Sequence, residues 1–171
     1  MKKVVLAIVL MMGFGAAMAQ SKVAHVNSQR ILDTLPSRKA AMVKLKEFET
    51  NGVNELKEME ADFNASYKKF TETSKDKTPL LLKIEEEKLM KKQQALQDRE
   101  QTLNQEMQAY SQELNKPILE RVQKAVEIVS DRKKLNYVID ESVTLYFKGG
   151  MDVTAEVIVE VLKLDAEAMK K

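Results

Sequence analysis

The sequence predicts an α+β protein with a small β-sheet body and a long projecting antiparallel coiled-coil helical hairpin. Its 171 residues are 32% charged and only 5% aromatic, a composition typical of long solvated helices. Five glycines and three prolines leave few places for the chain to turn. Between Pro36 and Pro117, apolar residues recur every seven positions, whereas the flanking segments contain short runs of β-branched and aromatic residues.

The first nineteen residues have the pattern of a secretory signal peptide. Two lysines precede an apolar run over residues 4–12, and a small-x-small sequence ends at Ala19, which predicts cleavage before Gln20. A retained membrane anchor is the weaker alternative, because spanning a bilayer takes about 20 apolar residues. Cleavage would remove two lysines and no acid, leaving equal numbers of acidic and basic residues. In a double-membrane bacterium, such a protein is expected in the periplasm.

Several classes of chemistry are disfavoured by composition. The absence of Cys excludes disulfides and thiolate sites, and no Gly-rich phosphate loop is present. The single histidine, His25, lies in a predicted strand without an acidic or Cys neighbour in the sequence, which favours a structural role over a ligand or a base. We therefore expect no enzyme activity and no cofactor. Export and a neutral mature chain also argue against nucleic-acid binding.

The prolines divide the mature chain into a body made of two parts and an arm. The first part of the body, residues 20–36, contains a strand over 22–27 and a short helix over 29–35, capped by Asn27 or Ser28. The second part, residues 117–171, contains a helix over 118–129, strands over 135–140 and 143–147, a Gly149-Gly150 stop and a last helix capped by Asp152 or Thr154. Pro36 and Pro117 are predicted hinges at the root of the arm.

Residues 37–116 form the predicted arm, with Ser37 as its cap and a tip near residues 71–79. The heptad row of the returning helix comprises Leu82, Leu89, Leu96, Leu103 and Tyr110. The positions four residues after the first three leucines are polar, so only one apolar row is available near the tip. Met59 and Met107 are expected to fill the seam, whereas Met42 and Met90 fit either the seam or an exposed contact.

The body is too small to be stable alone. About 70 residues without a disulfide or metal rarely supply more than about 3–5 kcal/mol from their own core. Its short strands would also leave open edges. Both problems are solved if several bodies join their strands into one closed sheet, so we expect an oligomer.

Four motifs resemble the Skp/OmpH family of periplasmic outer-membrane-protein chaperones. They are Lys22-Val23-Ala24-His25-Val26-Asn27, Lys116-Pro117-Ile118, Leu135-Asn136-Tyr137-Val138-Ile139-Asp140 and Asp152-Val153-Thr154-Ala155-Glu156-Val157. The resemblance implies a homotrimer with an intersubunit β-barrel body and three coiled-coil arms around a cavity. It also implies an ATP-independent holdase that keeps unfolded outer-membrane β-barrel proteins from aggregating. The alternative is a structural coiled-coil adaptor of the cell envelope that binds one folded partner.

The charge of the arm departs from the strongly basic arms that the resemblance implies. Residues 38–116 hold 15 basic and 15 acidic groups, so a positive excess remains only near the tip. Its lysines are Lys68, Lys69, Lys75, Lys77 and Lys83, against Glu72 and Asp76. These lysines are candidate contacts for an unfolded client, and for a membrane surface or lipopolysaccharide, with a solvated turn as the alternative.

Overall fold

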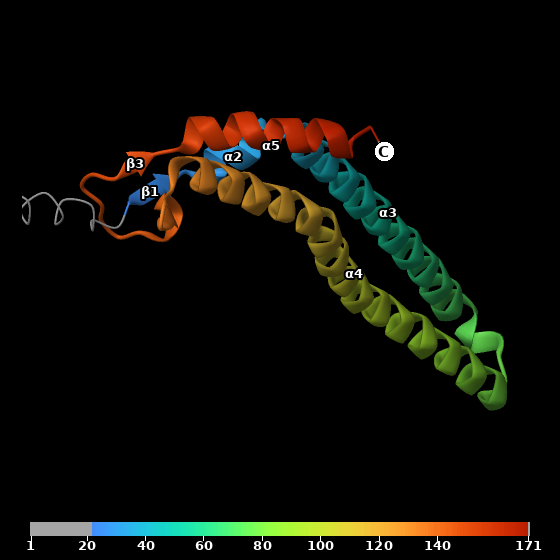
Figure 1. The fold of residues 1–171 in the computed structure, drawn as a ribbon. Helices are drawn as coiled ribbons and strands as arrows, with labels where there is room; N and C mark the ends of the chain where they lie inside the picture. The colour runs from blue at the N-terminus through green and yellow to red at the C-terminus, as the bar shows by residue number, and fades with distance from the viewer. Residues whose placement is uncertain (1–21, 171) are drawn as a thin grey trace, which may run out of the picture. The chain divides into compact units, whose positions relative to one another are not determined.

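The computed structural model describes residues 22–170, and the predicted signal peptide with its cleavage site at Ala19 and Gln20 lies outside them. The elements follow in the order β1 (Val23–Val26), α2 (Ser28–Thr34), α3 (Pro36–Thr73), η2 (Ser74–Asp76), α4 (Pro79–Lys133), β2 (Tyr137–Asp140), η3 (Glu141–Val143), β3 (Met151–Asp152) and α5 (Thr154–Ala168) (Figure 1). The predicted combination of a long helical hairpin and a small sheet is confirmed. The intersubunit barrel stays a prediction.

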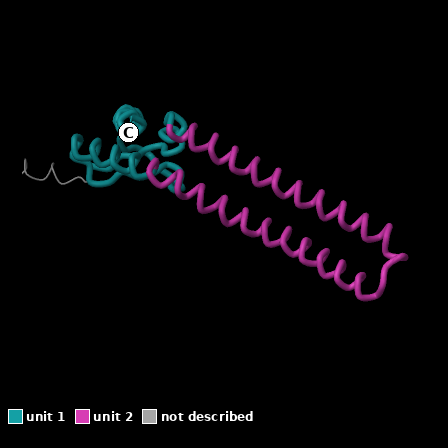
Figure 2. The backbone as a smooth tube through the Cα atoms, turned by 90° about the vertical axis from the view of Figure 1, so that its right-hand side faces the viewer, with its two compact units in different colours: residues 1–36, 119–171 teal, residues 37–118 magenta. Residues whose placement is uncertain are grey.

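The described chain divides into two compact units. Unit 1 comprises residues 22–36 and 119–170, and unit 2 comprises residues 37–118 (Figure 2). Helix α4 contributes its first part to unit 2 and its last part to unit 1. Across residues 22–170, none of the helices combines the length and apolar character that crossing a membrane requires.

Unit 1 is built on a parallel sheet with the strand order β2-β1-β3. In the central strand, Val23 lies opposite Tyr137 of β2, and Ala24 lies opposite Met151 of β3. Within the described residues, β2 and β3 are therefore the edge strands. Such edges offer backbone groups to further strands.

The core of unit 1 is aliphatic. Its buried side chains come from β1 (Ala24, Val26), α2 (Ile31, Leu35), α4 (Ala125, Val129), the residue before α5 (Val153) and α5 itself (Val157, Val161). The short helix α2 begins at Ser28, one residue before the predicted start, and Asn27 is its cap, because its side chain accepts a hydrogen bond from the Arg30 backbone amide at 2.9 Å. Asp152 accepts similarly from the Thr154 amide at 2.8 Å, where α5 begins.

The predicted strand over residues 143–147 is wrong. After β2 the chain turns through η3, where Asp140 accepts hydrogen bonds from the Ser142 amide and, through its carbonyl, from the Thr144 hydroxyl. The third strand is instead Met151–Asp152, which follows the two glycines rather than preceding them. Composition favours a strand here, but residues 143–147 pair with neither of the outer edges of the sheet, on β2 and β3, within the described chain.

The predicted break before residue 118 is also wrong, because α4 continues from Pro79 to Lys133 through Pro117. A proline inside a helix removes one hydrogen bond, but the many turns on either side keep this 55-residue helix continuous. At the other end, α3 begins at Pro36, so Ser37 lies inside the first turn rather than before it. Proline is well suited to this first position, since its missing amide hydrogen would have no partner there.

Unit 2 is an antiparallel pair of helices, which we call the hairpin. Figure 2 shows its two helical segments side by side and joined at one end, where η2 and the following residues make the predicted turn. The rings of Phe48 in α3 and Tyr110 in α4 lie 5.1 Å apart. Leu103 is buried, and the rest of its heptad row is half-buried, which confirms that this row faces the seam.

At Gly52, helix α3 lies directly against the Leu103 side chain of α4. A Cβ atom added there would lie 2.3 Å from Cδ1 of Leu103. Alanine should otherwise stabilise a helix by about 1 kcal/mol relative to glycine.

We therefore expect Gly52→Ala to stabilise the protein by about 1 kcal/mol in a Leu103→Ala background, but not in the wild type. In the wild type, Leu103 has to move to admit the new methyl group. Urea unfolding of the wild type, the two single variants and the double variant measures the coupling free energy between positions 52 and 103. Equal effects of Gly52→Ala in both backgrounds would show that the contact with Leu103 does not affect the free energy of unfolding.

Candidate functional site

A row of charged residues runs along the seam of the hairpin beside the leucine row. Glu85, Lys92 and Arg99 follow the leucines at 82, 89 and 96 by three positions, and all three are half-buried. Lys92 binds Asp62 at 2.6 Å and the Ser66 hydroxyl at 2.7 Å across the hairpin. Ionic contacts thus replace the second apolar row that a coiled coil normally has.

Arg99 binds two carboxylates at once, one from each helix of the hairpin. Its guanidinium donates to Glu55 of α3 and to Glu106 of α4, both at 2.8 Å. The hydrogen bond from Arg99, with its positive charge, lowers the pKa of Glu55 below the ordinary value of 4.5. The same two carboxylates raise the pKa of Arg99 further above its already high value. The heptad pattern did not predict this row, because a coiled coil places its second apolar row at the fourth position after each leucine, where these side chains are exposed.

The Glu55–Arg99 contact predicts an acid-sensitive contribution to hairpin stability. A carboxyl whose pKa is lower in the folded state stabilises that state above its unfolded pKa, and this stabilisation is lost as pH falls through the folded value. We expect the difference in melting temperature between the wild type and Glu55→Gln to be largest above pH 4.5 and to shrink below it. Thermal unfolding between pH 3 and 7 measures this difference. The control is Glu58→Gln, on the same helix, and a Glu55 difference independent of pH would contradict the assignment.

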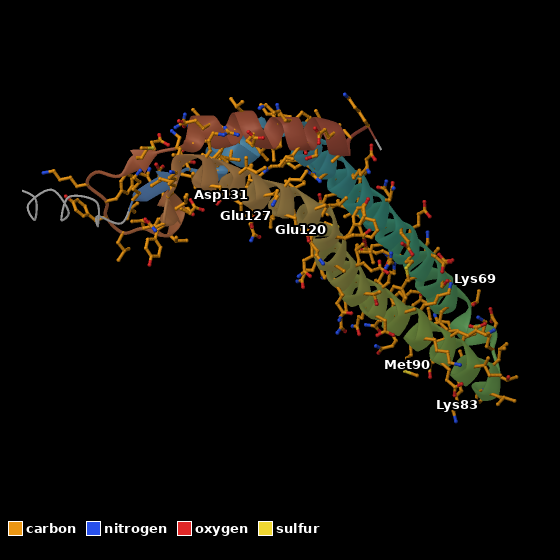
Figure 3. All side chains as sticks on the ribbon, viewed as in Figure 1. Lys69, Lys83, Met90, Glu120, Glu127 and Asp131 are labelled. Atoms are coloured by element: carbon orange, nitrogen blue, oxygen red, sulfur yellow. The ribbon has the colours of Figure 1, made fainter. Side chains whose placement is uncertain are left out.

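The tip of the hairpin exposes a cluster of apolar side chains beside lysines. Leu80, Leu81 and Ile84, in the first turns of α4, are 71%, 42% and 41% exposed. Successive apolar residues on a helix cannot all face one seam, so the run after Pro79 was a usable signal for this surface. We call Leu80, Leu81 and Ile84, together with the exposed Lys83 that lies among them in α4, the tip surface. In Figure 3, Lys69 lies along α3 and Lys83 along α4.

The five predicted tip lysines have different surroundings. Lys68 lies 4.0 Å from Glu72. Lys77 is only 14% exposed and forms an ion pair with Glu85. Among residues 22–170, no ion pair involves Lys69, Lys75 or Lys83.

A hollow of about 220 Å³ opens between the two helices near the tip. Phe70 and Leu89 supply its apolar wall, and Lys69, Lys77, Lys88 and Lys92 supply cations, with Glu85 the acid among the lining residues. The sequence analysis identified Lys69 and Lys77 but not Lys88 and Lys92. These two were hidden because a hairpin pairing register is needed to bring residues near 90 to those near 66.

His25 has acidic partners that the sequence analysis did not expect. Its Nδ1 lies 2.7 Å from Glu141 Oε1, and the ligand atoms of His25, Glu141 and Asp152 all lie within 4.8 Å of one another. These are residue types that bind metal ions. The second oxygen of Glu141 accepts a hydrogen bond from the side-chain Nδ2 of Asn27 at 2.8 Å, so the protein already occupies both oxygens of this carboxylate. The arrangement orders the segment after β2 against β1, because the His25 ring also packs 4.7 Å from the Phe147 ring.

Comparison with known proteins identifies the family of this chain. The profile of the family described as "Outer membrane protein (OmpH-like)" matches residues 22–161. The chain belongs to the OmpH-like family. This match covers both units of the OmpH-like fold, from β1 into α5.

Relatives of this OmpH-like protein include several proteins called Chaperone protein Skp. The protein of Photorhabdus luminescens is 30% identical over 150 residues, covering 85% of this chain and 88% of the relative. The protein of Yersinia enterocolitica is 28% identical over 157 residues, covering 89% and 93%. The crystal structure of an OmpH-like protein of Caulobacter crescentus CB15 has a TM-score of 0.73 at 20% identity, covering 87% and 86%, so it shares the fold.

The methionines of this OmpH-like protein occupy two kinds of position. Met59 and Met107 are half-buried along the seam. Met42 and Met90 are 62% and 61% exposed, so neither fills the seam, and their role as exposed contacts stays a prediction (Figure 3 labels Met90). Methionine is flexible and polarizable, and therefore adapts to differently shaped apolar partners.

The two prolines predicted as hinges lie beside the division between the units. Pro36 is the last residue of the first segment of unit 1, and Pro117 precedes the last residue of unit 2. The hinge role stays a prediction.

Proposed function

We propose that this OmpH-like protein is an ATP-independent periplasmic chaperone that holds unfolded outer-membrane β-barrel proteins and prevents their aggregation. The names of its relatives, Chaperone protein Skp, and the description of its family support this proposal. The observation that carries it is the tip surface, where exposed leucine and isoleucine side chains lie in the same helical turns as Lys83. An unfolded polypeptide offers apolar and acidic groups that such a surface would contact.

The proposed mechanism relies on many weak contacts. Each exposed apolar or cationic group would bind weakly, and several acting together would supply the affinity. Exposed ionic contacts contribute about 0.2–1 kcal/mol each, so no single contact would trap a client. Release would then need no nucleotide, because the client's own folding and membrane insertion would compete with these contacts.

The protein is further proposed to act as an oligomer, with the trimer that the family resemblance implies. Residues 143–147 carry four exposed apolar side chains, with Val143 78%, Leu145 105%, Tyr146 77% and Phe147 48% exposed. Exposed apolar clusters of this kind are typical of interaction sites. In the oligomer, three hairpins would bound a cavity that holds the client.

Light scattering of an aggregating client tests this function. A urea-unfolded outer-membrane barrel protein is diluted into buffer with and without the purified mature protein, in the absence of nucleotide. We expect molar excess to suppress the rise in scattering. Unchanged aggregation would overturn the holdase, and would favour an adaptor if the protein instead bound one folded partner at fixed stoichiometry.

A further inference from the structure

We propose that the hollow near the hairpin tip is a binding site for an apolar side chain with a neighbouring carboxylate in an unfolded polypeptide. This proposal rests on the proposed function and specifies the kind of client segment that the hairpin selects. It starts from the two kinds of group that line the hollow. Phe70 and Leu89 are half-buried and apolar, whereas Lys69 and Lys88 are exposed and cationic.

The charge of the hollow is only partly compensated within the described residues. Lys77 is neutralised by Glu85, and Lys92 by Asp62. No ion pair among residues 22–170 involves Lys69 or Lys88. Lys77 and Lys92 are therefore held in ion pairs with the protein. The ammonium groups of Lys69 and Lys88 remain available to an anion. An occupant with negative charge is therefore favoured over a neutral or cationic one.

The volume of the hollow favours a side chain over a larger ligand. Pockets for drug-sized molecules measure about 300–1,000 Å³, and this hollow, at about 220 Å³, is smaller. A lipid with several acyl chains would leave most of its apolar surface outside. One aromatic or aliphatic side chain fits, and its burial against Phe70 and Leu89 would add apolar contact to the charge attraction.

The absence of tryptophan from the protein allows a direct test. The probe is the peptide acetyl-Gly-Trp-Asp-Asp-Gly-amide, whose Trp fluorescence anisotropy reports binding, and the matched peptide carries Asn in place of both Asp residues. We expect the acidic peptide to bind more tightly than the Asn peptide, and its affinity to fall as salt rises. Equal binding of the two peptides would overturn the proposal.

The variant pair Lys69→Gln/Lys88→Gln removes the two available charges and leaves polar, flexible side chains in their place. It should weaken binding of the acidic peptide about fivefold at low salt, in keeping with the modest strength of exposed ionic contacts. The matched control Lys39→Gln/Lys44→Gln removes two exposed charges elsewhere on α3 and should leave binding unchanged. Equal losses in both pairs would show general electrostatics rather than a site, and would overturn the proposal.

Calorimetry with dodecyl phosphate tests whether a lipid-like amphiphile, rather than a polypeptide, binds in the hollow. Binding of this amphiphile that depends on Lys69 and Lys88, without binding of the acidic peptide, would overturn the choice of a polypeptide. The aggregation assay on the same preparations separates the two proposals. Suppressed aggregation without peptide binding defeats the site alone, whereas unsuppressed aggregation defeats the chaperone function whatever the peptide does.

Discussion

Replacing Leu145 and Tyr146 together by Asp should convert the protein from an oligomer to a monomer at micromolar concentration. These side chains are 105% and 77% exposed in the single chain. Burying a large apolar side chain contributes about 1.5–3 kcal/mol, so losing two and introducing charges should raise the dissociation constant by more than a hundredfold. Size-exclusion chromatography with light scattering measures the mass directly.

The matched control for this experiment is Val159→Asp. Val159 is another exposed apolar residue of unit 1, on α5, at 57% exposure, and its replacement should leave the oligomer intact. An oligomer that survives the Leu145 and Tyr146 changes would place the interface elsewhere. A wild-type protein that is already monomeric would remove the oligomer from the proposed function.

Replacing Arg121 by Ala should destabilise unit 1 by about 3 kcal/mol, since breaking a buried ion pair leaves a charge in a poor environment. The Nε atom of Arg121 in α4 lies 3.0 Å from Oδ1 of Asp165 in α5, and the Asp165 side chain is only 1% exposed. The pair therefore joins two helices that enclose the aliphatic core. Urea unfolding followed by circular dichroism, at matched protein concentration, measures the loss.

Lys124→Ala provides the control on the same helix, because the Lys124–Glu127 pair is 61% and 52% exposed. It should change stability by less than about 0.5 kcal/mol. Arg121→Lys should lie between the two, because lysine keeps the charge but lacks the planar fork of donors. A loss for Arg121→Ala no larger than the control would contradict the structural importance of the pair.

Local signals in the sequence predicted much of this fold. The turn beyond Thr73 follows from proline and polar residues between two heptad patterns. The leucine row of α4 faces the seam, as its spacing predicts. The cap at Asn27 follows from a short polar side chain before a helix. In each case, one segment of the chain carries enough information to specify its own conformation.

The sequence did not predict those features of the fold that depend on residues far away along the chain. Residues 143–147 have the composition of a strand but pair with neither outer edge of the described sheet. Pro117 could not end a helix that many turns on both sides stabilise. The charged row of Lys92 and Arg99, and the carboxylates around His25, depend on contacts between segments that are far apart in sequence. Spacing alone does not reveal such contacts without a pairing register.

Photo-crosslinking from two equally exposed positions tests the client-binding role of the hairpin most directly. Benzoylphenylalanine is placed at Met90 in the hairpin or at Val159 in unit 1, which are 61% and 57% exposed. Each protein is mixed with a urea-unfolded outer-membrane barrel protein during dilution and is then irradiated. The account predicts client adducts from position 90 and few or none from position 159. Adducts from position 159 without adducts from position 90 would contradict it.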